Sequence, residues 1–241
     1  MKLERVEDYN EMSQKAAEAI YDKIVNSDRV VLGLATGSTP EKMYGILAGM
    51  LNENSVDLSH VYTVNLDEYV GLASDHPQSY HHYMKNIFFD HVPIPPENTF
   101  IPDGAATDLD AEVKRYDRML EEIGGVDLQL LGIGRNGHIA FNEPGTAFDS
   151  RTHVVDLAET TIKDNARFFN TIEEVPTRAI SMGLDTILDA KSILLIASGE
   201  GKAAAIDGMI NGVESADMPA TVLQRHDDVT VLADKAAMGK L

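Results

Sequence analysis

Residues 29–40 read Arg29-Val30-Val31-Leu32-Gly33-Leu34-Ala35-Thr36-Gly37-Ser38-Thr39-Pro40, and this stretch decides the fold class. Its first half is a short apolar run with the length and β-branched content typical of a buried strand. Small residues then form a turn, and Thr39 followed by Pro40 is a favourable N-cap and first-turn pair for a helix. The stretch therefore predicts a strand that passes through a short loop directly into a helix, the unit from which α/β domains are built.

The same alternation continues along the rest of the chain. Apolar residues at helical spacing and short apolar runs predict helices over 8–25, 40–51, 79–89 and 107–123, and strands over 29–34, 61–66, 126–131, 178–182, 192–197 and 229–232. The segment 91–104 contains four prolines and is expected to be irregular. Strands that alternate with helices imply right-handed crossovers and a mostly parallel sheet. We therefore expect one domain over 1–241, an α/β, Rossmann-like fold with a mostly parallel central sheet flanked by helices.

Composition narrows the class of protein. The chain has 241 residues, 44% of them hydrophobic, with 20 Lys plus Arg against 39 Asp plus Glu and a net charge of −19. Such a field disfavours nucleic acid and anionic membranes as partners. There is no cysteine, which excludes disulfides and thiolate metal sites. The first eight residues lack the apolar core of a signal peptide, and no apolar run approaches the ~20 residues of a membrane helix, so a cytoplasmic location is expected. Self-association remains open.

Parallel α/β sheets bind ligands at the carboxyl ends of their strands, so the loops after strands are the places to search. The loop after the first strand contains Ala35, Thr36, Gly37, Ser38 and Thr39. Its small residues let a ligand approach the backbone, and the N–H groups at the start of the following helix suit a phosphate. An ordinary strand-to-helix turn would have the same composition.

The second loop brings two adjacent carboxylates, Asp67 and Glu68, to the end of the strand at 61–66. Catalytic groups commonly lie at this position in α/β folds. Acidic pairs on loops are nevertheless usually exposed to solvent, and the residues alone favour that interpretation.

The third loop reads Gly132-Ile133-Gly134-Arg135-Asn136-Gly137-His138 and continues to Glu143-Pro144-Gly145. It formally matches the dinucleotide pattern G-x-G-x-x-G, but Pro144 interrupts the long helix that this pattern requires, so we expect no bound dinucleotide. The more informative feature is a single histidine, His138, between Asn136 and Glu143. A carboxylate near an imidazole orients it and favours its protonated form, as a proton donor requires. A purely structural histidine is the alternative.

Two cations follow later in the chain. Lys202, in Ser198-Gly199-Glu200-Gly201-Lys202-Ala203, resembles the end of a P-loop without its spacing or its hydroxyl for Mg²⁺. At the start of a helix it could pair with a phosphate without metal. Arg167 precedes Phe168-Phe169 and could equally be a surface cation packed on its neighbours. No metal cluster is predicted, and His81, His82 and His91 are expected to be helix-surface or packing residues.

Taken together, these segments resemble the glucosamine-6-phosphate deaminase family through nearly the whole chain. The resemblance is carried by 34–40, 65–69, 137–144, 167–169 and Lys202. The most specific stretch is Gly137-His138-Ile139-Ala140-Phe141-Asn142-Glu143-Pro144. The related 6-phosphogluconolactonases read differently after the shared Gly-His, so Phe141-Asn142-Glu143 favours the deaminase.

The resemblance implies a reaction in which glucosamine 6-phosphate and water give fructose 6-phosphate and ammonia, without any cofactor or metal. It implies that Asp67 moves a proton between C2 and C1 of the opened sugar. It also implies that His138, supported by Glu143, delivers a proton to the ring oxygen. The phosphate would be held by residues 35–39 together with Arg167 and Lys202.

Two departures from the family pattern bear on these expectations. Many members carry an aspartate where this chain has Asn136. We still expect Asn136 to be an active-site residue, because its amide can orient His138 through hydrogen bonding. Allosteric members have basic residues after the segment equivalent to 150–152 and a longer tail, so we expect no activation by N-acetylglucosamine 6-phosphate. The alternatives are a 6-phosphogluconolactonase and a non-catalytic domain that binds a sugar-phosphate effector; the latter would need a DNA-binding segment, which this chain lacks.

Overall fold

The apolar run at the start of the quoted stretch forms strand β2 (Val30–Leu34), whose five residues are all buried. In the computed structural model, which describes residues 1–241, β2 lies inside a seven-stranded parallel sheet with the order β1-β10-β9-β6-β2-β3-β5. The other strands of this sheet are β1 (Lys2–Val6), β3 (Val61–Asn65), β5 (Thr99–Phe100), β6 (Leu128–Leu131), β9 (Ile193–Ala197) and β10 (Val229–Asp234). The prediction of a single α/β domain with a mostly parallel central sheet is confirmed.

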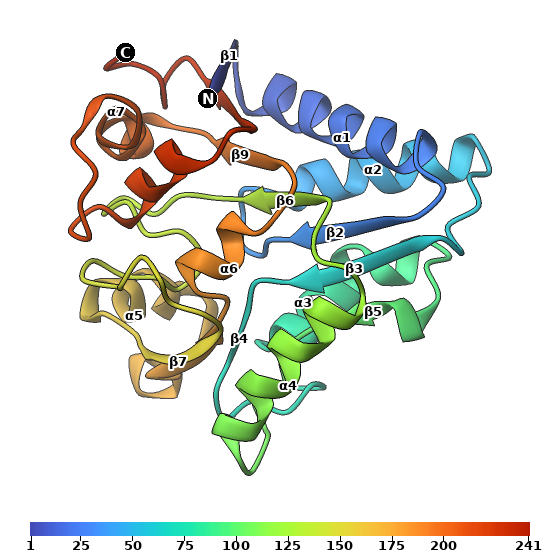
Figure 1. Ribbon diagram of the computed structural model, residues 1–241, viewed down its shortest axis with the longest axis horizontal. Helices are drawn as coiled ribbons and strands as arrows, with labels where there is room; N and C mark the ends of the chain where they lie inside the picture. Colours follow the sequence, from blue (N-terminus) through green and yellow to red (C-terminus); the bar gives the residue numbers. More distant parts are fainter.

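Helices cover the sheet and bury its apolar side chains (Figure 1). Their bounds are α1 (Tyr9–Val25), α2 (Glu41–Glu53), α3 (Tyr80–Ile87), α4 (Leu109–Glu122), α5 (Glu159–Asn165), α6 (Leu184–Leu188) and α7 (Ala203–Asn211). The four helices expected from periodicity are present, with ends within a few residues of prediction. Figure 1 shows α1 and α2 side by side, and both bury an apolar stripe in a core of 53 residues. None of the helices is both long and apolar enough to cross a membrane.

A second, antiparallel sheet was not expected. It has the order β4-β8-β7 and consists of β4 (Asp67–Tyr69), β8 (Arg178–Ser181) and β7 (His153–Asp156). The strand at 178–182 was therefore predicted correctly as a strand but assigned to the wrong sheet. An apolar run such as the one in β8 reports burial, and it does not report which strand will be its partner.

The remaining strands that sequence reasoning missed have weak local signals. Strand β1 is an edge strand with mostly exposed residues, and it pairs only with β10. Strand β5 has two residues within the proline-rich segment. Strands of this kind are held by their neighbours more than by their own apolar pattern.

The junction between the two sheets positions the functional site. Leu66 separates β3 from β4; its N–H bonds to the Leu34 carbonyl at 3.3 Å, and its carbonyl accepts from the N–H of Met182 at 2.8 Å. One residue therefore ties the end of β2 to the end of β8. As a result, the chain enters β4 at the carboxyl ends of the parallel strands, and Asp67 is the first residue past this edge.

Candidate functional site

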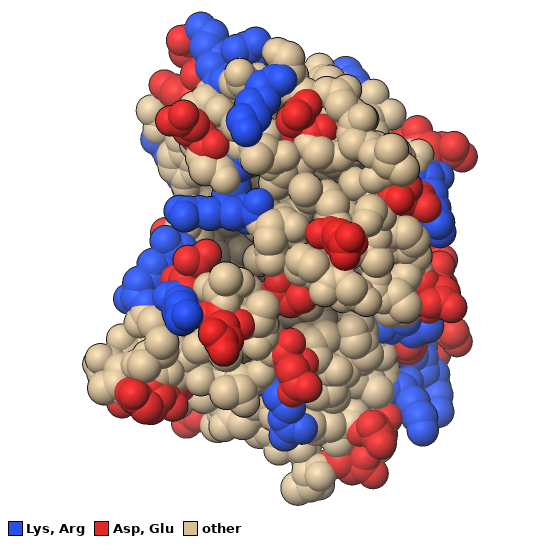
Figure 2. All heavy atoms as spheres, turned by 90° about the vertical axis from the view of Figure 1, so that its left-hand side faces the viewer, with Lys and Arg blue, Asp and Glu red and all other residues tan.

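A cleft of about 620 Å³ opens at the carboxyl ends of the parallel strands, where loops after β2, β3, β6 and β9 meet the segment around α5. Figure 2 shows a hollow in the surface with Lys and Arg side chains gathered at its mouth. Nine of the eleven residues predicted from the sequence line the cleft: Ala35, Thr36, Gly37, Ser38, Thr39, Asp67, His138, Arg167 and Lys202. The other two, Asn136 and Glu143, lie behind His138.

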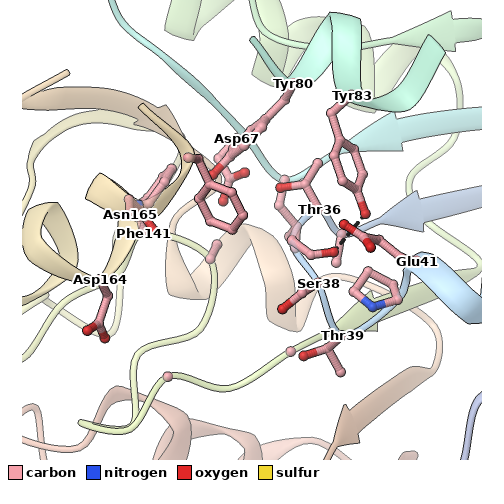
Figure 3. Close-up of a pocket in the computed structure, with 18 of the residues that line it drawn as sticks. Thr36, Ser38, Thr39, Glu41, Asp67, Tyr80, Tyr83, Phe141, Asp164 and Asn165 are labelled. Atoms are coloured by element: carbon pink, nitrogen blue, oxygen red, sulfur yellow. Dashed lines mark hydrogen bonds between the residues drawn. The ribbon is translucent and has the colours of Figure 1, made fainter. Parts of the chain in front are cut away.

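The loop after β2 is held from outside by three tyrosine hydroxyls. Tyr44 donates to the Ala35 carbonyl at 2.6 Å, Tyr83 to the Gly37 carbonyl at 2.7 Å, and Tyr9 to the Ser38 carbonyl at 3.1 Å. Figure 3 shows Tyr83 pointing at this loop. Because the carbonyls are engaged with these hydroxyls, the loop is fixed in one conformation beside the cleft. A preorganised loop of this kind suits an anionic group.

The predicted cap of the helix after this loop is wrong in detail. Pro40 rather than Thr39 occupies the N-cap position of α2, and no side chain caps the helix. The Thr39 hydroxyl is therefore not used by the helix, and Figure 3 shows Thr39 beside Ser38 at the cleft. The start of α2 keeps the uncapped N–H groups that make helix N-termini favourable for phosphate.

The adjacent carboxylates Asp67 and Glu68 are both buried, with 7% and 1% of their surface exposed, so the expectation of a solvent-facing pair is wrong. Their environments differ. Glu68 accepts hydrogen bonds from three backbone N–H groups and a histidine ring. No protein group donates a hydrogen bond to Asp67, which faces the cleft. Two carboxylates in such different surroundings are suited to different roles: Glu68 is a fixed anion, and Asp67 is free to exchange a proton.

Burial raises the pKa of Asp67 to about 8, and the charge of Glu68 adds to the effect. Part of the burial comes from an aromatic cluster at this end of the cleft. The Tyr69 and Tyr80 ring centroids are 4.9 Å apart, and the Tyr80 and Phe141 rings are stacked at 6.2 Å. Figure 3 shows Asp67 between Tyr80 and Phe141. A carboxyl group with a pKa near 8 can both take up and release a proton near neutral pH.

His138 lines the cleft with Glu143 behind it, as the sequence predicted. The two side chains approach to 3.5 Å between Nδ1 and Oε2. Glu143 also accepts from Thr161 and, at 2.9 Å, from Asn136 Nδ2. Burial raises the pKa of Glu143, but the nearby imidazole and the donated hydrogen bonds outweigh burial and lower the pKa to about 2. Glu143 is therefore a permanent negative charge beside the imidazole.

Asn136 orients His138 less directly than expected. Its Oδ1 accepts from the backbone N–H of His138 at 3.2 Å, and its amide group binds Glu143 rather than the imidazole. A glycine is needed at position 134 for a steric reason, because a Cβ there would lie 2.3 Å from the His138 ring. The glycine pattern that mimics a dinucleotide fingerprint thus provides room for an imidazole.

The cleft is also lined by three cations. Lys202, at the start of α7, donates to the Ile133 carbonyl at 2.6 Å. Arg167 stacks over the Phe168 ring at 4.6 Å and also lines the cleft. The third, Arg135, was not singled out from the sequence and forms no ion pair in residues 1–241. Burial lowers the pKa of Lys202, as do the charges of Arg135 and Arg167, whereas Asp164 opposes them. Mutually repelling cations of this kind favour a bound anion.

We expected His81 and His82 on α3 to be helix-surface or packing residues, and the structure gives each of them a specific place. His82 lines the cleft, and the His81 ring binds the buried Glu68. The start of α3 contacts β4, so its first residues face the cleft and the buried Glu68. In residues 1–241 no three His, Cys, Asp or Glu side chains come together in an arrangement suited to a metal ion.

The raised pKa of Asp67 gives a prediction about stability. Between about pH 4 and 8 the unfolded chain has lost the Asp67 proton while the folded chain keeps it, so stability falls as pH rises and the loss is complete above pH 8. Asp67→Asn cannot ionise. We compare the free energy of unfolding of this variant with that of the parent. The difference, variant minus parent, should be ~1–4 kcal/mol larger at pH 9 than at pH 4. Urea unfolding at both pH values measures this, with the exposed Asp75→Asn as control. An equal difference at both values would contradict it.

Comparisons with known proteins agree with this geometry. Residues 5–232 match the family described as glucosamine-6-phosphate isomerases/6-phosphogluconolactonase. The chain is 51% identical over 237 residues to the glucosamine-6-phosphate deaminase of Shouchella clausii, covering 98% of this chain and 96% of that one. A solved monomeric glucosamine-6-phosphate deaminase superposes with a TM-score of 0.97 at 50% identity, over 99% of each chain. The 6-phosphogluconolactonase of Trypanosoma brucei, with a TM-score of 0.82 at 20% identity over 100% of this chain and 98% of that one, shares the fold. The chain belongs to the glucosamine-6-phosphate isomerase/6-phosphogluconolactonase family.

Proposed function

We propose that this protein is an enzyme that converts glucosamine 6-phosphate and water to fructose 6-phosphate and ammonia. The observation that carries the proposal is the buried Asp67 carboxyl group, without a protein hydrogen bond, in the same cleft as His138 and three cations. A hydrolase acting on a lactone has no need for a base that moves hydrogen between carbons. Relatives about 50% identical over the whole chain are deaminases, whereas the lactonase structure is only 20% identical.

The first step in this proposal is opening of the sugar ring. A protonated His138, stabilised by Glu143, delivers a proton to the ring oxygen as the C1 hydroxyl loses its own. The bond between C1 and the ring oxygen breaks, and C1 becomes an aldehyde. The new carbonyl acidifies the C–H bond at C2, which also carries the amine.

Asp67 then removes the C2 proton and returns one to C1. After the first transfer O1 takes a proton from water and the product is an enolamine. The second transfer gives a hydroxymethyl group at C1 and an iminium at C2, which loses a proton to water to become an imine. Water adds to the imine, which collapses to a ketone with release of ammonia. The substrate's own aldehyde accepts the electrons, so no step in this route requires an organic cofactor.

The phosphate lies, in this proposal, between the loop 35–39 and the cations that line the cleft. Backbone N–H groups and hydroxyls of the loop donate to its oxygens, and Arg167 and Lys202 supply charge. The cations are clustered in a chain with a net charge of −19, where the surrounding field works against holding an anion. A charged sugar phosphate as substrate also agrees with the cytoplasmic location expected from the sequence.

Arg135 is proposed as a further phosphate-binding residue. Its guanidinium group lies beside Gly201, next to Lys202, with no carboxylate partner. We expect Arg135→Ala to raise KM for the sugar phosphate roughly 3- to 30-fold with little change in kcat, because it removes one charge-assisted contact to a non-reacting group. Steady-state kinetics measure this, with Arg118→Ala on α4 as the matched control. A reduced kcat at unchanged KM would place Arg135 elsewhere in the mechanism.

The experiment that tests the function is an ammonia assay on glucosamine 6-phosphate with purified protein and no added cofactor. Release of ammonia and fructose 6-phosphate in equal amounts is the expected result. Hydrolysis of 6-phosphogluconolactone is measured in parallel. Lactone hydrolysis without ammonia release would overturn the proposal in favour of the lactonase.

A further inference from the structure

Glu68, the second carboxylate of the acidic pair, has four hydrogen-bond donors, whereas the neighbouring Asp67 carboxyl group has none. Its Oε1 accepts from the N–H groups of Tyr69 and Tyr80 at 2.8 and 2.9 Å. Its Oε2 accepts from the N–H of His81 at 3.1 Å and faces the His81 Nδ1 at 2.8 Å. Two of these donors are the first N–H groups of α3, where the helix dipole favours a negative charge. Glu68 is therefore a buried anion whose hydrogen-bond donors all come from Tyr69 and the start of α3.

His81 connects this buried charge with the surface. Its side chain is 32% exposed, whereas the Glu68 side chain is 1% exposed. Because a carboxylate only accepts hydrogen bonds, the short contact requires a hydrogen on the His81 Nδ1. The other charged group that acts on His81 is Glu112 of α4, which is itself bound by Arg115 through two hydrogen bonds. His81 is thus the side-chain donor to Glu68, and Glu112 is already satisfied by an arginine.

We propose that His81 is a positioning residue for the deamination, acting through Glu68 on the proton affinity and placement of Asp67. The inference rests on the function proposed above. It concerns a histidine that does not line the cleft itself.

The electrostatic part of the argument has a definite sign. The negative charge of Glu68 disfavours a second negative charge on Asp67 and so helps Asp67 to hold its proton. The hydrogen bond from His81 draws part of that charge away from Asp67. Removing the His81 donor should therefore strengthen proton binding by Asp67, and removing the charge of Glu68 should weaken it. The ionisable groups that interact with this pair are Asp67 and Tyr69, which are coupled to Glu68, and Glu112, which is coupled to His81. Tyr80 and Tyr116 are coupled to Asp67, and Arg115 is coupled to Glu112.

The mechanical part concerns placement. The contacts of Glu68 join β4 to the start of α3, and these two elements carry Asp67 and Tyr80 into the cleft. If the His81 donor is lost, one of the three bonds that join Glu68 to the start of α3 is lost as well. A base that is displaced from its reacting atom loses rate in kcat rather than in KM.

The test compares the pH dependence of kcat/KM in the parent with that in His81→Phe and Glu68→Gln. We expect the ascending limb to move to higher pH by about 0.5–1 unit in His81→Phe, which lowers kcat/KM at pH 7 roughly 3- to 10-fold. In Glu68→Gln the limb should move to lower pH. His81→Asn, whose amide N–H can replace the Nδ1 donor, should restore the parent profile, and His91→Phe serves as the matched histidine control. The constant for inhibition by inorganic phosphate should stay unchanged throughout.

The proposal is overturned if the ascending limb of the kcat/KM profile lies at the same pH in the parent, in His81→Phe and in Glu68→Gln. A merely structural role would lower activity without moving the limb in opposite directions in the two variants. A second measurement is independent of turnover. The ¹³C shift of the Asp67 carboxyl group, titrated in the parent and in His81→Phe, reports the same change in proton affinity. If the parent releases no ammonia, the proposed function fails, and this titration still decides whether His81 acts on Asp67.

Discussion

Asp67→Asn is expected to lower kcat for ammonia release by at least ~100-fold while leaving binding of the sugar phosphate nearly intact. The amide has the shape of the carboxyl group but cannot take the proton from C2. The charges that act on Asp67 include no cation of the phosphate site, so the contacts that bind the non-reacting end of the substrate are kept. Steady-state kinetics give kcat, and inhibition by inorganic phosphate gives the binding of the anion.

Asp75→Asn, in the exposed loop that follows β4, is the matched control and should behave like the parent. The outcome that would contradict the assignment of the base is a variant with parental kcat and weakened binding. Such a result would mean that Asp67 only contacts the substrate and that another group moves the hydrogen.

Lys202→Ala should produce the largest loss of binding. Its ammonium group is half-buried, donates to the Ile133 carbonyl and lies near Arg135 and Arg167. A charge-assisted contact is worth ~1.5–3 kcal/mol, which corresponds to an increase in KM of roughly 10- to 100-fold. The inhibition constant of inorganic phosphate should rise by a similar factor, because the lost contact is to the phosphate itself.

Lys191→Ala provides the control, since Lys191 pairs with Asp127 at 2.7 Å outside the cleft. If Lys202→Ala binds inorganic phosphate like the parent, the anion must be held elsewhere in the cleft. A fall in kcat at unchanged phosphate binding would instead indicate that Lys202 acts on the reacting carbons.

The positions of the site residues follow from one topological fact that the sequence could indicate. Apolar runs followed by glycine-containing loops mark the ends of β2 and β6, and parallel strands bring such ends to one edge. This is why the loops that contain Thr36 and Lys202, more than 160 positions apart, were expected at the same edge. That both residues bind the phosphate was implied by the family resemblance. The helices were equally accessible, because their amphipathic spacing is a local property.

The small antiparallel sheet was not accessible in the same way. Its strand β4 has only three residues, two of them acidic, and their alternation contains no indication of burial. The pairing with β8, the rings of Tyr80 and Phe141 and the start of α3 cover them and turn a polar loop into a buried edge of the cleft. The same holds for Arg135, whose importance depends on Gly201 and Lys202 lying beside it rather than on its neighbours in sequence.

The sequence by itself determined the parallel α/β architecture, the set of loops that meet at its edge and the residue types available for acid–base chemistry and phosphate binding, because these depend on local periodicity and on strand direction. Only the tertiary structure decided the state of each group. Asp67 and Glu68 are neighbours with the same chemistry, yet one lacks hydrogen bonds and has a pKa of about 8, whereas the other has four donors. Burial and hydrogen bonding set that difference, and the fold supplies both: the donors to Glu68 are Tyr69 beside it and the start of α3, and the rings of Tyr80 and Phe141 close over this end of the cleft.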